Sequence, residues 1–279
     1  MFTWKPLIDG GASVMGILNV TPDSFSDGGR WFDPELALDH ALTLLKDGAD
    51  VIDIGGESTR PGALPVSEEE EAARVVPLVA AIAGSAIVSV DTMKASVALA
   101  AIEAGAQIVN DVSGGRHDPE MLRVVAESRV GFIAMHMQGE PRTMQLEPHY
   151  SNVVREVTAH LVESRNSALD AGVSEDAIML DPGIGFGKSL QHNLSLLAHI
   201  EDICAATSSP ILIGASRKSF IGSIQKTGSD AMMREDGTTA TTVWALEHGA
   251  SMVRVHNVAD AHRAVEIVRS LSMAKSVGA

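Results

Sequence analysis

Residues 14–29 read VMGILNVTPDSFSDGG, an apolar run that ends at Asn19 and opens into a polar, glycine-rich loop. A continuous apolar run of this length is typical of a parallel strand that is covered on both faces. Residues 49–63, ADVIDIGGESTRPGA, repeat the pattern, because a second apolar run leads into glycine, hydroxyl and arginine residues. In an α/β barrel, the loops at the carboxyl ends of the strands build the active site. Both stretches therefore predict a barrel strand followed by a functional loop.

The same pattern recurs along the whole chain. Predicted strands lie near 14–20, 50–54, 86–91, 106–111, 130–136, 177–181, 210–215 and 250–256. Helical patterns alternate with them at 34–47, 67–83, 94–104, 119–128, 150–171, 190–205, 218–225 with 237–248, and 258–271. Such alternation predicts an α/β protein, a (β/α)8 TIM barrel with a single domain over 1–279. An open doubly wound sheet is the alternative, because strand order cannot be read from sequence.

The composition limits the kinds of partner. Acidic residues outnumber basic residues by 36 to 21, giving a net charge of −15, so nucleic-acid binding is not expected. No apolar run approaches the roughly 20 residues of a membrane span, and the first residues lack the pattern of a signal peptide. The single cysteine, Cys204, fits a reducing compartment. We expect a cytoplasmic enzyme that acts on small molecules, without a nucleic-acid or membrane partner.

Polar residues follow the predicted strands at the end where a barrel enzyme carries its chemistry. They are Asn19, Asp53, Asp91, Asn110, Asp111, His136, Asp181, Ser216, Arg217, Lys218, Arg254 and His256. Asp91, Asn110 and Asp181 offer acceptors and donors at fixed positions, which suit a flat heterocycle with ring N–H and amino groups. Each of the three alone is equally compatible with capping the helix that follows. Together, and beside a group of cations, they favour ligand binding.

The second group of candidates is cationic. Arg254 and His256 are two residues apart in the last predicted strand, so their side chains point to the same face. That strand closes the barrel beside the first strand, which ends at Asn19. With Arg60 and the hydroxyl groups of the second loop, these side chains suit a Mg2+-bound diphosphate, because Mg2+ prefers oxygen ligands.

Three other kinds of site are not supported. The glycines of 183–187 do not match the dinucleotide pattern GxGxxG, and are expected to let a loop pass close to a ligand beside the aromatic face of Phe186. His136 and His149 have no HxH, HExxH or paired-cysteine spacing that would indicate zinc. No GxSxG nucleophile motif is present.

Two motifs resemble the signatures of the dihydropteroate synthase family. They are MGILNVTPDSFSDGG at 15–29 and GGESTRPGA at 55–63. The resemblance continues through VDT at 90–92, NDVS at 110–113, DPG at 181–183, SRKS at 216–219 and RVH at 254–256. The family implies a (β/α)8 enzyme of folate synthesis that joins 6-hydroxymethyl-7,8-dihydropterin diphosphate to 4-aminobenzoate. The products it implies are diphosphate and 7,8-dihydropteroate.

The resemblance also implies a role for each matching residue. The residues that would hold the pterin are Asp91, Asn110, Asp181 and Lys218, with Met135 also at the substrate. Asn19 would ligate Mg2+, and the diphosphate would be held by Thr59, Arg60, Arg254 and His256. The residues implied around the aminobenzoate are Phe25, Arg60, Pro61, Phe186 and Ser219. The implied catalytic set is Asp91, Asp181, Lys218, Arg254 and His256.

The family further implies how the reaction proceeds and how the chain assembles. A pterin pocket that stabilises positive charge lets diphosphate leave first, and the neutral arylamine then captures the cation. Relatives imply a homodimer packed through barrel helices away from the active-site loops. The loop at 59–61 has no insertion and resembles that of sulfonamide-sensitive members.

Two alternatives from other functional classes use a similar barrel. A pterin-dependent methyltransferase that serves a corrinoid protein has no need for the groups at 57–61 and 254–256 that suit a diphosphate. A non-catalytic pterin-binding paralogue is expected to have lost phosphate-binding or Mg2+-binding residues, and here they are all present.

Overall fold

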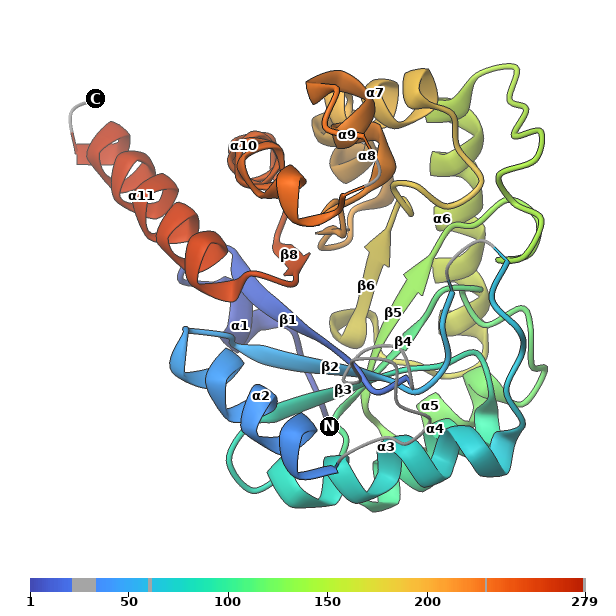
Figure 1. Ribbon diagram of the computed structural model, residues 1–279. Helices are drawn as coiled ribbons and strands as arrows, with labels where there is room; N and C mark the ends of the chain where they lie inside the picture. Colours follow the sequence, from blue (N-terminus) through green and yellow to red (C-terminus); the bar gives the residue numbers. More distant parts are fainter. Residues whose placement is uncertain (22–33, 60–61, 229, 278–279) are drawn as a thin grey trace.

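Eight parallel strands form one sheet at the centre of the computed structural model, which describes residues 1–21, 34–59, 62–228 and 230–277 (Figure 1). The strands are β1 Ser13–Asn19, β2 Val51–Gly55, β3 Ile87–Asp91, β4 Ile108–Asp111, β5 Gly131–Met135, β6 Ile178–Asp181, β7 Leu212–Ile213 and β8 Met252–Val255. Their order is β6-β5-β4-β3-β2-β1-β8-β7. The Leu180 amide donates to the Pro210 carbonyl over 3.0 Å, and Leu180 forms a bridge with Ile211. These contacts join β6 to the start of β7, so the sheet closes into the expected (β/α)8 barrel and the open-sheet alternative is wrong.

The helices lie outside the strands (Figure 1). They are α1 Lys5–Ile8, α2 Pro34–Lys46, α3 Glu68–Ile82, α4 Ala95–Glu103, α5 Met121–Ser128, α6 Val153–Asp170, α7 Leu190–Ala198, α8 Ile200–Thr207, α9 Ser219–Gln225, α10 Glu235–Glu247 and α11 Val258–Val277, with 3-10 turns at Glu175–Ala177 and Met232–Arg234. The helix expected over 190–205 is two helices that meet at His199, where φ is −122° and ψ 30°. The sequence reading missed α1. Among the described residues, no helix is both long and apolar enough to cross a membrane.

Apolar side chains form two separate layers, one on each side of the barrel wall. The inner layer contains one residue from each of seven strands, together with Trp4 of α1: Met15, Val51, Ile108, Ile133, Met179, Leu212 and Met252. Their strand neighbours, such as Ile52, Phe132 and Leu180, belong to the outer layer against the helices. This division follows from the alternation of side chains along a strand. Each strand therefore has an inward and an outward set of positions that can be read from its register.

The inward positions change from apolar to polar toward the carboxyl ends of the strands. Two residues beyond the inner apolar layer are Asp53, Asn110, Asp181 and Arg254. Because residues two apart face the same side, these polar groups lie inside the barrel above an apolar floor. The fold thus places a polar ring where barrel enzymes carry their chemistry.

Trp4 closes the floor of the barrel and provides a test of this arrangement. It is 1% exposed, and its indole Nε1 donates to the Ala177 carbonyl over 2.9 Å. We expect Trp4→Ala to lower the free energy of unfolding by about 3–5 kcal/mol, because it leaves a cavity and an unpaired carbonyl. Urea denaturation measures this change, with Leu146→Ala at an exposed position as the control. Equal stability of the two variants would contradict the assignment of Trp4 to the core.

Candidate active site

Strand register brings the predicted site residues to one rim. Asn19 is paired with Gly55, Gly55 with Asp91, and Asp91 with Asn110 on adjacent strands. On the other side of the barrel, Met135 is paired with Asp181. The prediction that carboxylate and amide groups from different strands gather at the carboxyl ends is confirmed.

Arg254 connects three strands across this rim. Its Nε lies 2.6 Å from Asp53 Oδ2, and its Nη2 lies 2.7 Å from Asp91 Oδ2. Asn110 donates from Nδ2 to the same oxygen of Asp53 over 2.9 Å. Charge-assisted hydrogen bonds of this length are strong and directional. Arg254, expected to hold the diphosphate, therefore lies beside Asp91, a carboxylate expected to hold the pterin.

Asp53 is a central residue whose role the sequence reading did not assign. Its side chain is fully buried, and its Oδ1 has no hydrogen-bond partner among the described residues. The available signal was a single carboxylate inside the apolar run 51–54, at an inward position. A buried carboxylate of this kind needs a cation or donors nearby, which Arg254 and Asn110 supply.

The electrostatics of the rim depend on burial and on Arg254. Burial raises the pKa of Asp91; Arg254 opposes the shift, while Asp53 adds to it. Burial alone lowers the pKa of the Arg254 guanidinium, but Asp53 and Asp91 raise it above its usual value. Arg254 thus remains a cation, and its charge opposes, without reversing, the rise in the pKa of Asp91 to about 7.

Asp181, Lys218 and Phe186 form a second wall of the site. Asp181 Oδ1 accepts from the Gly183 amide over 2.7 Å. Lys218 Nζ lies 3.9 Å from the centre of the Phe186 ring, a cation–π contact. Burial lowers the pKa of Lys218 to about 8, and Asp181 opposes that shift. Phe186 and Met135 belong to one apolar cluster with Met93, Val112, Met137 and Met144. A flat ring can therefore find both polar edges and an apolar face here.

Ser216 orients His256 at the end of β8. The Ser216 hydroxyl lies 3.0 Å from His256 Nδ1, and the His256 amide donates to Ser216 Oγ over 3.2 Å. The neighbouring Arg217 does not join the cation group, because its guanidinium is paired with Glu235. The charge of Arg217, one of the polar residues expected at the strand ends, is therefore already balanced by Glu235.

The remaining polar candidates fall into three groups. Asp111 accepts from the amides of Ser113 and Gly115, which makes it the cap of a turn and not a ligand group. Thr59 is half-buried, and Ser219 is the exposed first residue of α9. The predictions for Phe25, Arg60 and Pro61 lie outside the described residues.

The residues at Asn19 are compatible with a hard cation. Asn19 Oδ1 and Asp91 Oδ2 each lie 3.7 Å from the position that a Cβ on Gly55 would occupy, so two oxygens approach one point on the rim. Among the described residues, no three His, Cys, Asp or Glu side chains form a metal-binding group. Asp91 Oδ2 is already paired with Arg254, so Asn19 Oδ1 is the protein oxygen that suits Mg2+, which is usually bound through one or two protein oxygens together with substrate phosphates.

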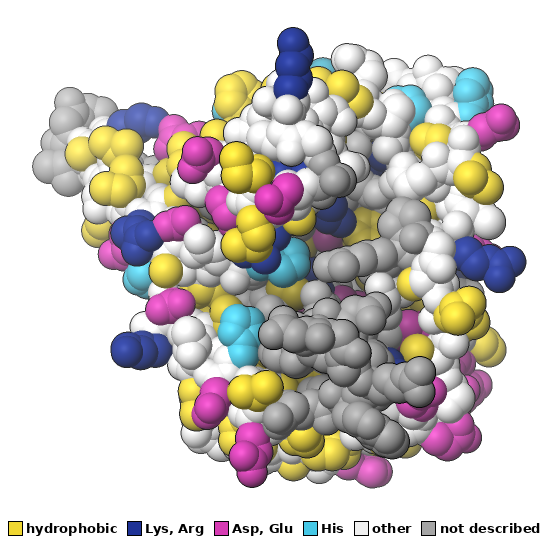
Figure 2. All heavy atoms as spheres, in the orientation of Figure 1, with side chains coloured by type: hydrophobic (Ala, Val, Ile, Leu, Met, Phe, Trp, Pro, Cys, Tyr) yellow, Lys and Arg dark blue, Asp and Glu magenta, His cyan; other side chains and the backbone are white. Residues whose placement is uncertain are grey.

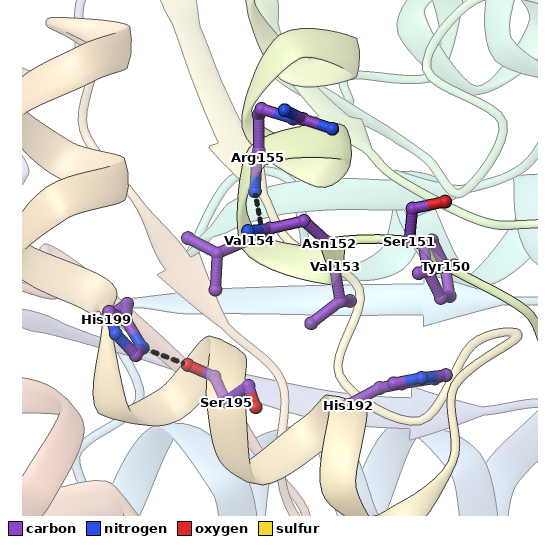
Figure 3. Close-up of a pocket in the computed structure, with 9 residues that line it drawn as sticks. All are labelled: Tyr150, Ser151, Asn152, Val153, Val154, Arg155, His192, Ser195 and His199. Atoms are coloured by element: carbon purple, nitrogen blue, oxygen red, sulfur yellow. Dashed lines mark hydrogen bonds between the residues drawn. The ribbon is translucent and has the colours of Figure 1, made fainter.

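A separate pocket of about 530 Å³ lies outside this polar ring (Figure 3). It is lined by residues 150–155 before and within α6, and by His192, Ser195 and His199 from α7 and its end. None of the predicted site residues lines it, so the pocket plays no part in the site described here.

Comparisons with known proteins agree with this geometry. The model of the pterin binding enzyme family matches residues 15–256. A dihydropteroate synthase of Mycobacterium leprae is 46% identical over 261 residues, covering 91% of this chain and 92% of the relative. A Xanthomonas albilineans dihydropteroate synthase solved with 4-aminobenzoic acid superposes with a TM-score of 0.87 at 43% identity, over 94% of this chain and 93% of the other. The same organism's enzyme solved with 7,8-dihydropteroate gives 0.84 at 40% identity, with 94% of each chain covered.

The polar ring in the barrel mouth and the family match together define the class: the chain belongs to the pterin binding enzymes. Within that class it belongs with the dihydropteroate synthases, transferases that join a dihydropterin to 4-aminobenzoate.

Asp53 is the residue of the site that most needs a direct test. We expect Asp53→Ala to lower the free energy of unfolding by about 3–5 kcal/mol, because Arg254 loses a buried partner. We expect kcat/KM to fall by about 100-fold as Arg254 and Asn110 lose their orientation. Urea denaturation and a dihydropteroate synthesis assay measure the two effects. Asp39→Ala, at an exposed position on α2, is the control for stability; activity equal to that of this control would contradict the assigned role.

Proposed function

We propose that the barrel rim performs Mg2+-dependent condensation of 6-hydroxymethyl-7,8-dihydropterin diphosphate with 4-aminobenzoate, releasing diphosphate and 7,8-dihydropteroate. The observation that carries this proposal is the inward ring in which Arg254 pairs with Asp53 and Asp91, opposite Asp181 and Lys218. This ring combines acceptors for a pterin with cations for a leaving diphosphate.

The pterin ring is proposed to lie between Asp91 and Asn110 on one side and Asp181 and Lys218 on the other. Carboxylates accept from the ring N–H and amino groups, while Asn110 and Lys218 donate to ring nitrogen or oxygen. The cluster of Met135 and Phe186 supplies apolar contact for the ring face. A site that pairs every polar edge of a heterocycle discriminates strongly against analogues that lack one of those groups.

The diphosphate is proposed to lie next to the pterin methylene at the rim, held by Thr59, Arg60, Arg254 and His256. Asn19 would hold Mg2+ there, and the ion, when bound, neutralises charge on the leaving diphosphate. The aminobenzoate is proposed to lie among Phe25, Arg60, Pro61, Phe186 and Ser219, where a sulfonamide that mimics it would compete. The sulfonamide assignment stays a prediction.

The proposed chemistry needs positioning and charge, and no strong base. The C–O bond between the pterin methylene and diphosphate breaks first, and the electron pair leaves with the diphosphate. The amino nitrogen of aminobenzoate then forms a C–N bond with the cationic methylene carbon and loses one proton. Asp91 and Asp181, aimed at the pterin, stabilise the positive charge, while Arg254 and His256 stabilise the departing anion. A methyltransferase would have no use for this second group, which favours synthase chemistry.

We place the enzyme in the cytoplasm as a homodimer that binds neither nucleic acid nor membrane. Helices α10 and α11 pack against each other. The dimer proposal is supported by the large apolar side chains that these two helices expose. They are Val243, Trp244, Ile267, Leu271 and Met273, all exposed. Figure 2 shows apolar side chains gathered along α11 toward its carboxyl end. An exposed apolar surface of this kind on a folded protein marks a contact with another chain.

The activity is tested by diphosphate release. Release is expected to require the pterin substrate, aminobenzoate for full rate, and Mg2+, and to stop when EDTA removes the metal. Asp181→Asn is expected to lower kcat/KM by about 100-fold or more, because an amide cannot balance the developing positive charge. Asp176→Asn, exposed at the amino end of β6, is the matched control. Wild-type turnover in Asp181→Asn, or full activity in EDTA, would refute the mechanism.

The dimer is tested by sedimentation equilibrium. The wild-type chain is expected to sediment at twice its mass of 29.3 kDa, and the double variant Ile267→Asp with Leu271→Asp at the monomer mass, because two carboxylates would be buried in the contact. Leu146→Asp, exposed in the loop after β5, is the control. A monomeric wild-type chain, or a dimeric double variant, would show that this face is not the interface.

A further inference from the structure

Lys188, near the end of the loop between β6 and α7, is buried against neutral partners. It is 3% exposed, and its Nζ lies 2.9 Å from His136 Nδ1, 2.9 Å from the Phe186 carbonyl oxygen and 3.4 Å from the His136 carbonyl oxygen. These three acceptors use all three donors of an ammonium group. Burial and the Lys188 charge lower the pKa of His136 to about 2, so its ring is neutral and Nδ1 accepts. A buried cation without a carboxylate in contact is costly, and so calls for a functional explanation.

Near Lys188, two glycines let the loop after β6 approach the backbone after β5 closely. A Cβ at Gly183 would lie 1.9 Å from the His136 carbonyl oxygen, and one at Gly187 would lie 2.5 Å from that of Gln138. Both glycines have positive φ, 66° and 61°. The loop after β6 therefore lies directly on the backbone that follows β5, and Lys188 fastens the two together.

This fastening reaches the active site through Phe186. The Phe186 carbonyl is held by Lys188, while the Phe186 ring lies under Lys218 Nζ. A Cβ on Gly185 would lie 2.9 Å from Lys218 Cδ, so the same loop also limits where Lys218 can lie. Lys188 thus sets the position of a loop that faces the expected pterin site, although its own ammonium group lies against His136, away from the polar ring.

We propose that Lys188 is a positioning residue for the pterin wall: it holds the Phe186–Lys218 pair in place through the loop after β6, and its charge acts on Asp181. The inference rests on the proposed function of that wall. It assigns a role to a residue that touches neither substrate nor Lys218 directly.

The charge of Lys188 lowers the pKa of Asp181. Burial raises the pKa of Asp181, and this rise is opposed by the Gly183 amide, Lys218, Lys188 and Arg254 in that order. Removing the Lys188 charge therefore raises the pKa of Asp181 further. Asp181, whose carboxylate is needed for pterin binding, is then protonated at a higher pH. The fall in pterin affinity on the acid side of the pH profile (the acid limb) therefore moves to higher pH.

The other groups around Lys188 do not account for such a shift. The groups that face it are His136 after β5, His160 on α6, Arg116 after β4, Tyr150 before α6, His192 on α7 and Lys218 after β7. Burial lowers the pKa of His136 to about 2 and of His160 to about 4, and raises that of Tyr150 to about 13. The lowered pKa of the partly exposed His192 keeps that ring neutral near pH 7. Lys188 itself has a pKa lowered by burial to about 7, so its charge, and with it the proposed effect, is fullest below neutrality.

The experiment compares Lys188→Met with Lys46→Met, an exposed control on α2. Calorimetry measures binding of 6-hydroxymethylpterin between about pH 5 and pH 9, and kinetics measure KM and kcat over the same range. Lys188→Met is expected to weaken pterin binding about tenfold at pH 6, with the acid limb moved to higher pH, because it removes a charge and three hydrogen bonds. Lys46→Met is expected to match the wild-type enzyme.

Lys188→Gln separates charge from hydrogen bonding and serves if the methionine variant does not fold. It retains donors for the Phe186 carbonyl without a charge, so the acid limb is still expected to move upward. An unchanged pH profile and unchanged pterin affinity in a folded Lys188 variant, with only a lowered melting temperature, would overturn the inference and leave Lys188 a purely structural residue. Failure of the wild-type enzyme to bind pterin would instead count against the proposed function, so the two failures are distinguishable.

Discussion

The site depends on one buried cation held between two carboxylates. Arg254 on β8 reaches Asp53 on β2 and Asp91 on β3, although β1 lies between β8 and β2 in the sheet. The contact therefore spans the mouth of the barrel and fixes the distance between strands that do not pair. Burying a guanidinium costs free energy unless its donors are satisfied, so neither carboxylate can be lost cheaply. The same constraint orients Asn110, which shares the oxygen of Asp53 that Arg254 uses.

Charge balance in the rim explains how a site without a strong base can act. Asp53, Asp91 and Asp181 face Arg254, Lys218 and, behind the wall, Lys188. Burial disfavours the charged forms of Asp91, Asp181, Lys218 and Lys188, and neighbours of opposite charge oppose that effect. A cation formed on the substrate adds one positive charge beside three carboxylates, while a leaving diphosphate meets Arg254 and His256. Such an arrangement is preorganised, because its dipoles and charges are already in place before bond cleavage.

Much of this architecture follows from sequence because strand and helix periods are local. The apolar runs predicted all eight strands, and the alternation of side chains identified the inward residues once the strand ends were known. Local patterns could not show which side chains form ion pairs with each other. Arg217 and Arg254 looked alike as cations near strand ends, but Glu235 of α10 binds the first and two barrel carboxylates bind the second. Asp53 was visible as a carboxylate in an apolar run, yet its role depends on Arg254, 201 residues further along the chain. The break at His199 was hidden for a different reason: apolar spacing continues through it, so the period of the pattern does not change.

The glycine-rich segment after β6 has a partner within the protein that the sequence did not show. From sequence, its glycines suggested close approach to a ligand, since a missing Cβ permits any close contact. In the structure, Gly183 and Gly187 approach the backbone after β5, while Gly185 lies against Lys218 and Gly183 also lies near Met135, both residues of the expected site. The segment is therefore first a joint between two loops, and Lys188 is the group that closes it. A loop held on its outer side by a buried ammonium needs no ligand to take up its shape, which is the condition for a pterin wall to exist before the substrate arrives.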